Sequence, residues 1–123
     1  MIISIALVIL IIIGEIITQN YTKKTVNDLN RELEELKQSL SNNLEDDVNQ
    51  KIEEIDGKWE DVHDKLACYI EHDELEKVET NLTACKSLAQ TRNYDMAICE
   101  IEKTSFVLDH ITDKYSFNLV NIF

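Results

Sequence analysis

Apolar side chains recur at steps of three and four residues along the middle of the chain, from Val26 to Tyr69. Side chains spaced in this way lie on one face of an α-helix, which has about 3.6 residues per turn. The chain also has no proline and only two glycines, so it lacks the residues that hairpin turns and sheet corners need. The pattern therefore predicts an all-α protein. The stripe consists of Val26, Leu29, Leu33, Leu36, Leu40, Leu44, Val48, Ile52, Ile55, Trp59, Val62, Leu66 and Tyr69.

The spacing of this stripe changes over residues 40–52, where every step is four residues. Residues 41–43, Ser-Asn-Asn, can cap a new helix whose first turn is acidic. We therefore expect one helix that ends near residue 40 and a second over residues 44–71, with one continuous rod as the alternative. Gly57 lies inside the second helix and indicates close packing or a slight kink there.

Two further helices are expected in the second half of the chain. Asp73 and Glu76 have the spacing of a capping box, so a third helix is predicted to begin at Asp73. Around Arg92 and Asn93 the chain can turn, because Asn tolerates the left-handed conformation that closes a helix, and a fourth helix is predicted from about Tyr94. Short connections make such helices antiparallel neighbours, so the sequence predicts an antiparallel bundle of three or four helices. The expected core positions are Leu75, Val78, Leu82, Cys85, Ala89, Ala97, Ile98, Ile101, Leu108 and Ile111.

The N-terminus reads as a single transmembrane helix. Residues 1–17 are apolar apart from Ser4, Gly14 and Glu15, and as a helix they span about 25 Å, which residues 18–21 extend to about 30 Å, the thickness of a hydrocarbon core. No Lys or Arg precedes the run and no small-residue cleavage site follows it, which favours an uncleaved anchor over a signal peptide or a buried core helix. The expected domains are a transmembrane anchor (1–21), a membrane-proximal amphipathic helix or linker (22–43) and a helical bundle (44–123).

One charged residue, Glu15, interrupts the apolar run. Near the end of a span its side chain can reach the membrane interface, which makes an ordinary boundary charge one interpretation. However, Ser4, Glu15 and Thr18 are separated by 11 and three residues, about three turns and one turn, and so share one helix face. That stripe would suit a neighbouring transmembrane helix, which makes these three residues candidate partner-binding positions.

The charge of the soluble part limits its partners. Acidic residues outnumber basic residues 24 to 12, and the formal net charge is −12. A surface of this sign repels nucleic acid and anionic membrane surfaces. The first basic residues, Lys23 and Lys24, follow the span. By the positive-inside rule these two lysines place the body in the cytoplasm, although two charges are a weak signal.

Chemical motifs are sparse. Glu60 and His63 match half of a di-iron helical motif, but neither other histidine completes a second half. Cys68 and His72 share a helix face that is otherwise charged, as expected for an exposed thiol and a loop histidine rather than a metal site. We find no phosphate loop and no catalytic triad motif, so we expect no metal, no cofactor and no enzymatic activity.

Three cysteines leave at least one thiol unpaired and do not resemble a disulfide scaffold. Folding the last two helices about residue 92 puts Cys85 and Cys99 at similar heights. A disulfide between them is one interpretation and a pair of buried thiols is the other, since Cys85 lies on the core seam and Cys99 lies off it.

Several residues of the second half carry a family resemblance: Trp59, the His72-x-Glu74 pair and the final Asn121-Ile122-Phe123 are its most specific marks. With these residues the chain resembles domain of unknown function family 4363 over roughly residues 48–123. The members of that family are short, mainly clostridial proteins with an N-terminal membrane span. The resemblance implies a bacterial, membrane-anchored helical domain without assigned activity. It also implies a body outside the cytoplasm. The positive-inside rule indicates the opposite orientation, so both orientations remain as alternatives.

The physical chemistry of those marks favours structural roles. Trp59 lies on the apolar seam and is expected to be a large core anchor. His72 and Glu74 flank the start of the third helix, where polar side chains satisfy free backbone donors. Asn121, Ile122 and Phe123 either pack back onto the bundle or form a short recognition tail for a partner.

Three functional hypotheses remain. The preferred one is a membrane-tethered, non-catalytic interaction module or accessory subunit that binds another membrane protein. The second is a ligand-sensing bundle that acts through a partner, which would need a cavity lined by convergent polar groups. The third is a homo-oligomeric coiled coil formed by the seam from Val26 to Leu40.

Overall fold

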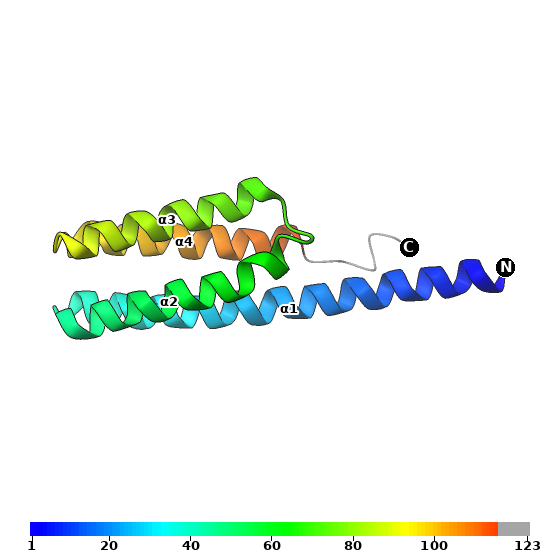
Figure 1. Cartoon of the computed structure of the whole chain (residues 1–123), viewed down its shortest axis with the longest axis horizontal. Coiled ribbons are helices and arrows are strands. Elements are labelled where there is room, and N and C mark those ends of the chain that lie inside the picture. Colours follow the sequence, from blue (N-terminus) through cyan, green and yellow to red (C-terminus); the bar gives the residue numbers. More distant parts are fainter. Residues whose placement is uncertain (116–123) are drawn as a thin grey trace.

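The computed structural model describes residues 1–115, and this part of the chain contains four α-helices and no strand (Figure 1). The predicted all-α fold is therefore confirmed. The C-terminal residues Asn121, Ile122 and Phe123, predicted to pack on the bundle or bind a partner, lie outside the described residues. The helices are α1 (Ile2–Ser41), α2 (Glu45–Leu66), α3 (His72–Gln90) and α4 (Tyr94–Lys114).

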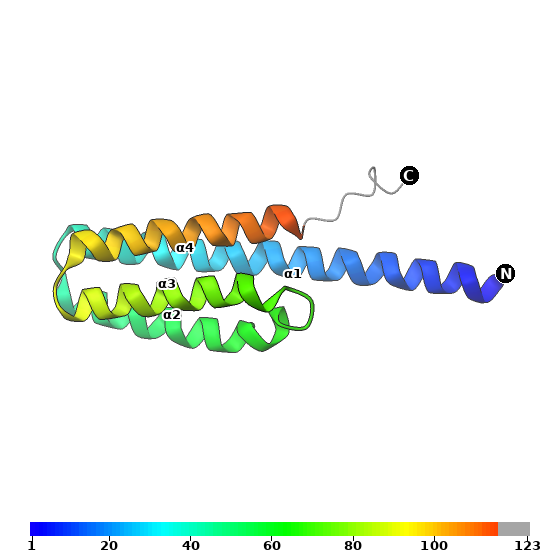
Figure 2. The same ribbon diagram turned by 90° about the horizontal axis from the view of Figure 1, so that it is seen from above.

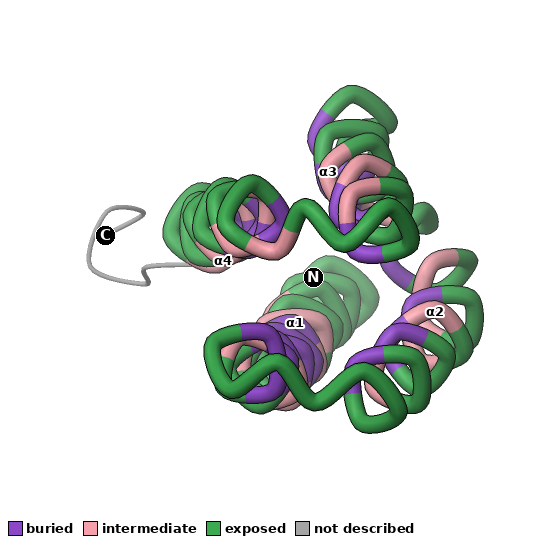
Figure 3. Tube along the Cα trace, turned by 90° about the vertical axis from the view of Figure 1, so that its left-hand side faces the viewer, coloured by how far each residue is buried: buried purple, intermediate pink, exposed green. Residues whose placement is uncertain are grey.

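The helices alternate in direction and form an antiparallel four-helix bundle (Figure 2). Helix α1 packs along both α2 and α4, and α3 packs closely along α4. Helices α2 and α3 make the fewest contacts of any neighbouring pair, although they complete the ring in the view along the bundle (Figure 3). The antiparallel bundle predicted from the short connections is confirmed. Of the predicted three or four helices, the described residues form four.

The core is formed by the apolar seams that the spacing predicted. The buried residues of each helix lie on the side that faces the centre of the bundle (Figure 3). Leu44 is an exception, with 47% of its surface exposed, because it precedes α2 in the turn. Ile98 is only partly buried, as are Val62 and Tyr69. The buried apolar residues of the predicted seams are Val26, Leu29, Leu33, Leu36, Leu40, Val48, Ile52, Ile55, Trp59, Leu66, Leu75, Val78, Leu82, Cys85, Ala89, Ala97, Ile101, Leu108 and Ile111.

Two left-handed residues make the tight turns at the far end of the bundle. Asn43 has φ 55° between α1 and α2, and Arg92 has φ 62° between α3 and α4. The amide of Leu44 donates to the Ser39 carbonyl (3.0 Å), which closes the end of α1 and reverses the chain. The alternative of one continuous rod is therefore wrong. The predicted side-chain cap from residues 41–43 is also wrong, since Leu44 is the N-cap of α2 and makes no side-chain cap bond.

The predicted start of α3 and end of α2 need correction. Helix α3 begins at His72 with Glu71 as N-cap, so Asp73 lies in its first turn and the predicted capping box with Glu76 does not form. Helix α2 ends at Leu66 rather than near residue 71, because the following loop turns Ile70 into the core. Gly57 does not mark close packing, since a Cβ atom there would meet no atom within 4 Å.

The first half of α1 extends beyond the bundle as a free helix (Figure 1). Among the described residues, α1 is the helix long and apolar enough to cross a membrane, and its apolar window is not buried by any part of the bundle. From Thr22 onward α1 is part of the core, so the bundle begins before residue 44. Helix α4 ends at the same end of the bundle from which the apolar half of α1 emerges.

Candidate functional site

The polar stripe of the apolar segment continues the core-facing side of α1. Ser4 and Glu15 are exposed and Thr18 is partly exposed. Thr22 follows Thr18 by four residues, about one turn, and is buried with 2% of its surface exposed. Continued at helical spacing, the same face reaches Leu29 and then the rest of the α1 seam. Helices α2 and α4 pack along α1 inside the bundle, whereas beyond the bundle the described helices leave this face open.

A small polar layer closes the bundle where the apolar segment leaves it. The Thr22 hydroxyl donates to the Thr18 carbonyl (2.7 Å) and lies 2.6 Å from the Tyr69 hydroxyl. The Tyr69 hydroxyl lies 3.3 Å from the same carbonyl. Burial raises the pKa of Tyr69, although its hydrogen bond with Thr22 acts in the opposite direction. These contacts attach the first residues of the free segment rigidly to the loop after α2.

Sequence reasoning placed Tyr69 in the apolar seam and missed this layer. Thr18, Thr22 and Thr25 follow one another at steps of four and three residues directly after the apolar run. Thr25 is also buried, with 6% of its surface exposed. These three hydroxyl side chains at helical spacing are the sequence signal for the polar layer. If they are buried, they need hydrogen-bond partners nearby.

The residues that carried the family resemblance separate in space. Trp59 is a core residue, as predicted, with 5% of its surface exposed and its ring edge-on to His63 at 5.5 Å. His72 is exposed, with its Nε2 atom 3.7 Å from Glu76 Oε2. The predicted capping role of His72 and Glu74 is wrong, since no side chain caps α3. Glu74 instead lies buried between α3 and α4.

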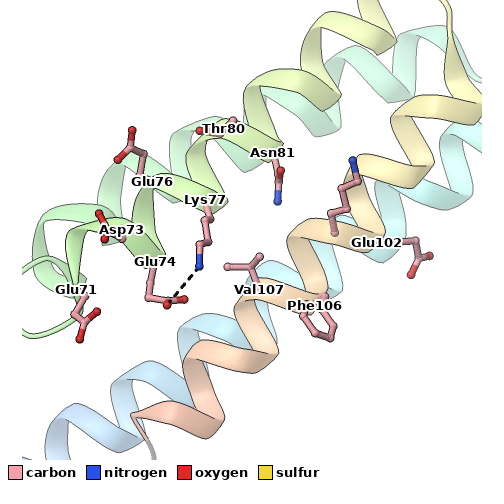
Figure 4. Close-up of a pocket in the computed structure, with 11 residues that line it drawn as sticks. Glu71, Asp73, Glu74, Glu76, Lys77, Thr80, Asn81, Glu102, Phe106 and Val107 are labelled. Atoms are coloured by element: carbon pink, nitrogen blue, oxygen red, sulfur yellow. Dashed lines mark ion pairs between the residues drawn. The ribbon is translucent and has the colours of Figure 1, made fainter.

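Glu74 is the centre of a charged cluster that joins the start of α3 to the end of α4, and Figure 4 shows its ion pair with Lys77. Its Oε1 atom lies 3.7 Å from Lys77 Nζ and 3.6 Å from Lys114 Nζ. Lys114 Nζ also lies 3.4 Å from Glu71 Oε2, and the Glu71 amide donates to the Tyr115 hydroxyl (2.8 Å). Burial lowers the pKa of Lys114, but the hydrogen bond and charge of Glu71 outweigh it, so the net direction is upward.

The sequence contained no signal for this cluster. Glu71 and Tyr115 are 44 residues apart, and only the antiparallel packing of α3 on α4 brings them together. The order of the helices had been predicted, but not their register. Lys114 and Tyr115 therefore could not be named as partners of Glu71 and Glu74.

The cysteines and the candidate metal ligands do not form a chemical site. All three cysteines are free, and Cys99 is exposed while Cys85 is buried, so neither the disulfide nor the pair of buried thiols is found. Burial is the main cause that raises the pKa of Cys85, to about 11. Within residues 1–115, no three His, Cys, Asp or Glu side chains converge as a metal ion would require.

Comparison with known proteins gives one relationship. No curated protein and no solved structure matches the chain. A protein family described as domain of unknown function (DUF4363) matches residues 16–122. The match begins one residue after Glu15 and includes all of α2, α3 and α4. Because it covers nearly the whole chain, this four-helix protein belongs to the domain of unknown function DUF4363 family.

Proposed function

We propose that this chain is a single-pass membrane protein whose four-helix bundle stands at the membrane surface. Residues 2–21 would form a helix of about 30 Å, which equals the thickness of a hydrocarbon core. Their large apolar side chains are exposed along the helix, from Ile2 at 84% to Ile17 at 61%. Such a surface is costly in water and favourable in lipid. The attachment at Thr22 and Tyr69 supports a bundle held close to the bilayer.

The proposed role is that of a non-catalytic interaction module or accessory subunit of another membrane protein. The single observation that carries it is the continuity of the Ser4, Glu15 and Thr18 stripe with the core-facing side of α1. Polar groups inside a span usually face another helix, because lipid offers them no hydrogen bonds. A transmembrane helix of the partner would therefore cover this face in the bilayer, as α2 and α4 cover it in the bundle.

The bundle geometry also bears on the homo-oligomeric coiled coil. That hypothesis needs the seam from Val26 to Leu40 as an intermolecular surface. The seam is used inside the chain, since Leu29, Leu33 and Leu40 are each 1% exposed. A second copy would have to displace α2 and α4 to reach it, so we do not favour this alternative.

The membrane part of the proposal is tested by extraction of native membranes with alkaline carbonate. We expect the full chain to stay in the membrane pellet and to be released only by detergent. Release of the full chain by carbonate alone would refute the proposed span. A peripheral membrane protein of known behaviour serves as the control for complete extraction.

The partner is tested by co-purification in mild detergent with matched variants of the stripe. Glu15→Ile removes the charge, and the double variant Glu15→Ile, Ile17→Glu keeps the composition but moves the charge about 200° around the helix. We expect both variants to lose a membrane partner that the native chain retains. Retention of the same partner by both would contradict the proposed interface. Deletion of Asn121 to Phe123 tests the C-terminal tail in the same assay.

A further inference from the structure

A groove runs between the first half of α3 and the second half of α4, at the end of the bundle where the apolar half of α1 leaves it (Figure 4). Its volume is about 910 Å³. Glu74, Lys77 and Asn81 point from α3 toward α4, and Val107 points from α4 back toward α3 (Figure 4). Five carboxylates and two lysines line the groove, so its charge is negative even though it contains internal ion pairs.

Glu74 is unusual among the carboxylates of this groove. Only 6% of its surface is exposed, and its two lysine contacts, at 3.6 and 3.7 Å, are made by Oε1 and exceed hydrogen-bond length. Its other oxygen, Oε2, is buried and accepts no hydrogen bond from residues 1–115. A buried charged oxygen without a donor costs free energy, typically about 1–3 kcal/mol or more.

The position of Glu74 in the first turn of α3 does not explain this arrangement. Acidic residues near a helix N-terminus are stabilised by the helix dipole, and Asp73 in the same turn is exposed to solvent as that role allows. A dipole interaction does not require burial, nor does it leave an oxygen without a donor. Glu74 Oε2 is therefore a buried acceptor that no donor of residues 1–115 uses.

The neighbours of Glu74 indicate what kind of donor fits. The Lys77 side chain is 60% exposed and makes a long contact, so it can move into solvent at little cost. On the α4 side the groove includes two apolar residues, Val107, which is partly buried, and Phe106, which is 74% exposed, beside the charged Glu102 and Lys103. Such walls suit the aliphatic stem of a long cationic side chain.

We propose that this groove binds a Lys or Arg side chain presented by a basic, partly apolar segment of a partner protein. The ammonium or guanidinium group donates to Glu74 Oε2 once the exposed Lys77 side chain has moved aside, while Lys114 stays on Oε1. The stem of the cationic side chain packs on Val107, and an adjacent apolar residue covers Phe106. The formal charge of −12 favours the approach of a basic segment over an acidic one.

The probe is a short fluorescent peptide of alternating Arg and Leu, titrated by anisotropy against the full chain in zwitterionic phosphatidylcholine nanodiscs. Glu74→Gln is expected to weaken binding about tenfold, the usual effect of losing a charge-assisted hydrogen bond. The matched control, Glu53→Gln, removes the same charge from an exposed position on α2 and should change the affinity less than about twofold. Equal effects of the two substitutions would mean general attraction to an acidic protein and would overturn the proposal.

Two further variants keep the test decisive if Glu74→Gln does not fold. Lys77→Ala removes the internal competitor and should strengthen peptide binding severalfold, whereas Lys86→Ala, which removes a lysine paired with Asp56 elsewhere, should not. Phe106→Ala should weaken binding severalfold without loss of helicity, because the side chain is exposed. No change in either Lys77→Ala or Phe106→Ala would refute the groove. The groove is separate from the Glu15 stripe, so failure here would leave the proposed membrane partner standing.

Discussion

Trp59 of α2 is buried in the core, with 5% of its surface exposed. Its indole Nε1 is also buried and donates to no acceptor among residues 1–115. Its value to the fold is therefore its volume rather than its polar group. We predict that Trp59→Ala lowers the free energy of unfolding by about 3–5 kcal/mol, as expected for a large cavity. Trp59→Phe should cost much less, because it removes an unsatisfied donor and keeps most of the ring. Urea denaturation followed by circular dichroism measures both, and equal losses would contradict the prediction.

The three thiols differ in burial, which predicts different reactivity. Cys68 and Cys99 are exposed, whereas Cys85 is 3% exposed and its pKa is raised to about 11 by burial and by the charges of Glu100 and Asp56. Since the thiolate is the reactive form, Cys85 should be inert toward Ellman's reagent in the native protein at pH 8. We expect two thiols to react before unfolding and the third only in denaturant. Fast reaction of all three would show that the core is open at Cys85.

The same residue predicts a loss of stability at alkaline pH. The folded protein keeps the Cys85 proton up to about pH 11, while the unfolded chain releases it near the ordinary value of 9.0. The free energy of unfolding should therefore fall as the pH rises from 9 to 11, by at most about 2–3 kcal/mol from this group. Tyr69, whose pKa burial also raises, acts in the same direction. The difference in slope between the native chain and Cys85→Ala isolates the thiol, and identical slopes would refute its role.

At the scale of the helices, the spacing of apolar residues predicted the core positions well, whereas the local capping signals did not predict the helix boundaries. The seams of α1 and α2 placed nearly every core residue, because burial of one face is a property of the whole helix. The boundaries were less accurate. Helix α2 ends at Leu66, and the loop after it places Ile70 in the core, a tertiary contact that the residues near it do not encode. The Asp73 capping box likewise had the right spacing but lay inside the first turn of α3.

The candidate site shows the same limit. The sequence could group Ser4, Glu15 and Thr18 because they lie on one helix, where sequence spacing alone fixes the shared face. Glu74 and Lys114 were not found as a pair, because their proximity depends on how α3 and α4 slide against each other. The register of two helices is set by side-chain packing over their full length, so no short motif reports it.

The continuity of α1 fixes how the Glu15 stripe is oriented relative to the bundle. Insertion of two alanines between Ile17 and Thr18 would rotate Ser4 and Glu15 by about 200°, whereas four alanines would rotate them by about 40°. The Thr18, Thr22 and Tyr69 contacts stay on the bundle side of both insertions. We predict that the two-residue insertion abolishes co-purification of the membrane partner and that the four-residue insertion retains it.

The two insertions separate orientation from length. If only the length of the span mattered, the four-residue insertion would be the more harmful, because it lengthens the helix by about 6 Å rather than 3 Å. The opposite order supports a rotationally fixed interface. Equal binding by both insertions would mean that the bundle and the span recognise the partner independently.

At the scale of the whole molecule, the two halves of α1 differ in their packing. The first half is the exposed apolar segment, and the second half is part of the bundle core. Among residues 1–115, every buried apolar residue lies between Val26 and Ile111, and the apolar segment adds none. The bundle should therefore not depend on the segment for its stability. Conversely, the bundle holds the segment in place through Thr22 and Tyr69, at the end where α4 also finishes.

This division predicts that removal of residues 1–21 leaves a soluble, cooperatively folded bundle. The truncated chain keeps Thr22 and every buried apolar residue of the described core, loses the partly buried Tyr21, and loses the exposed apolar surface that requires lipid or detergent. We expect it to stay in solution without detergent, to be monomeric by light scattering, and to unfold in urea with a single transition. Its free energy of unfolding should be lower than that of the full chain in detergent by about 1–3 kcal/mol, because the two hydrogen bonds to the Thr18 carbonyl and the packing of Tyr21 are lost. Aggregation, or helicity without a cooperative transition, would mean that the apolar half of α1 is part of the core rather than an appended segment.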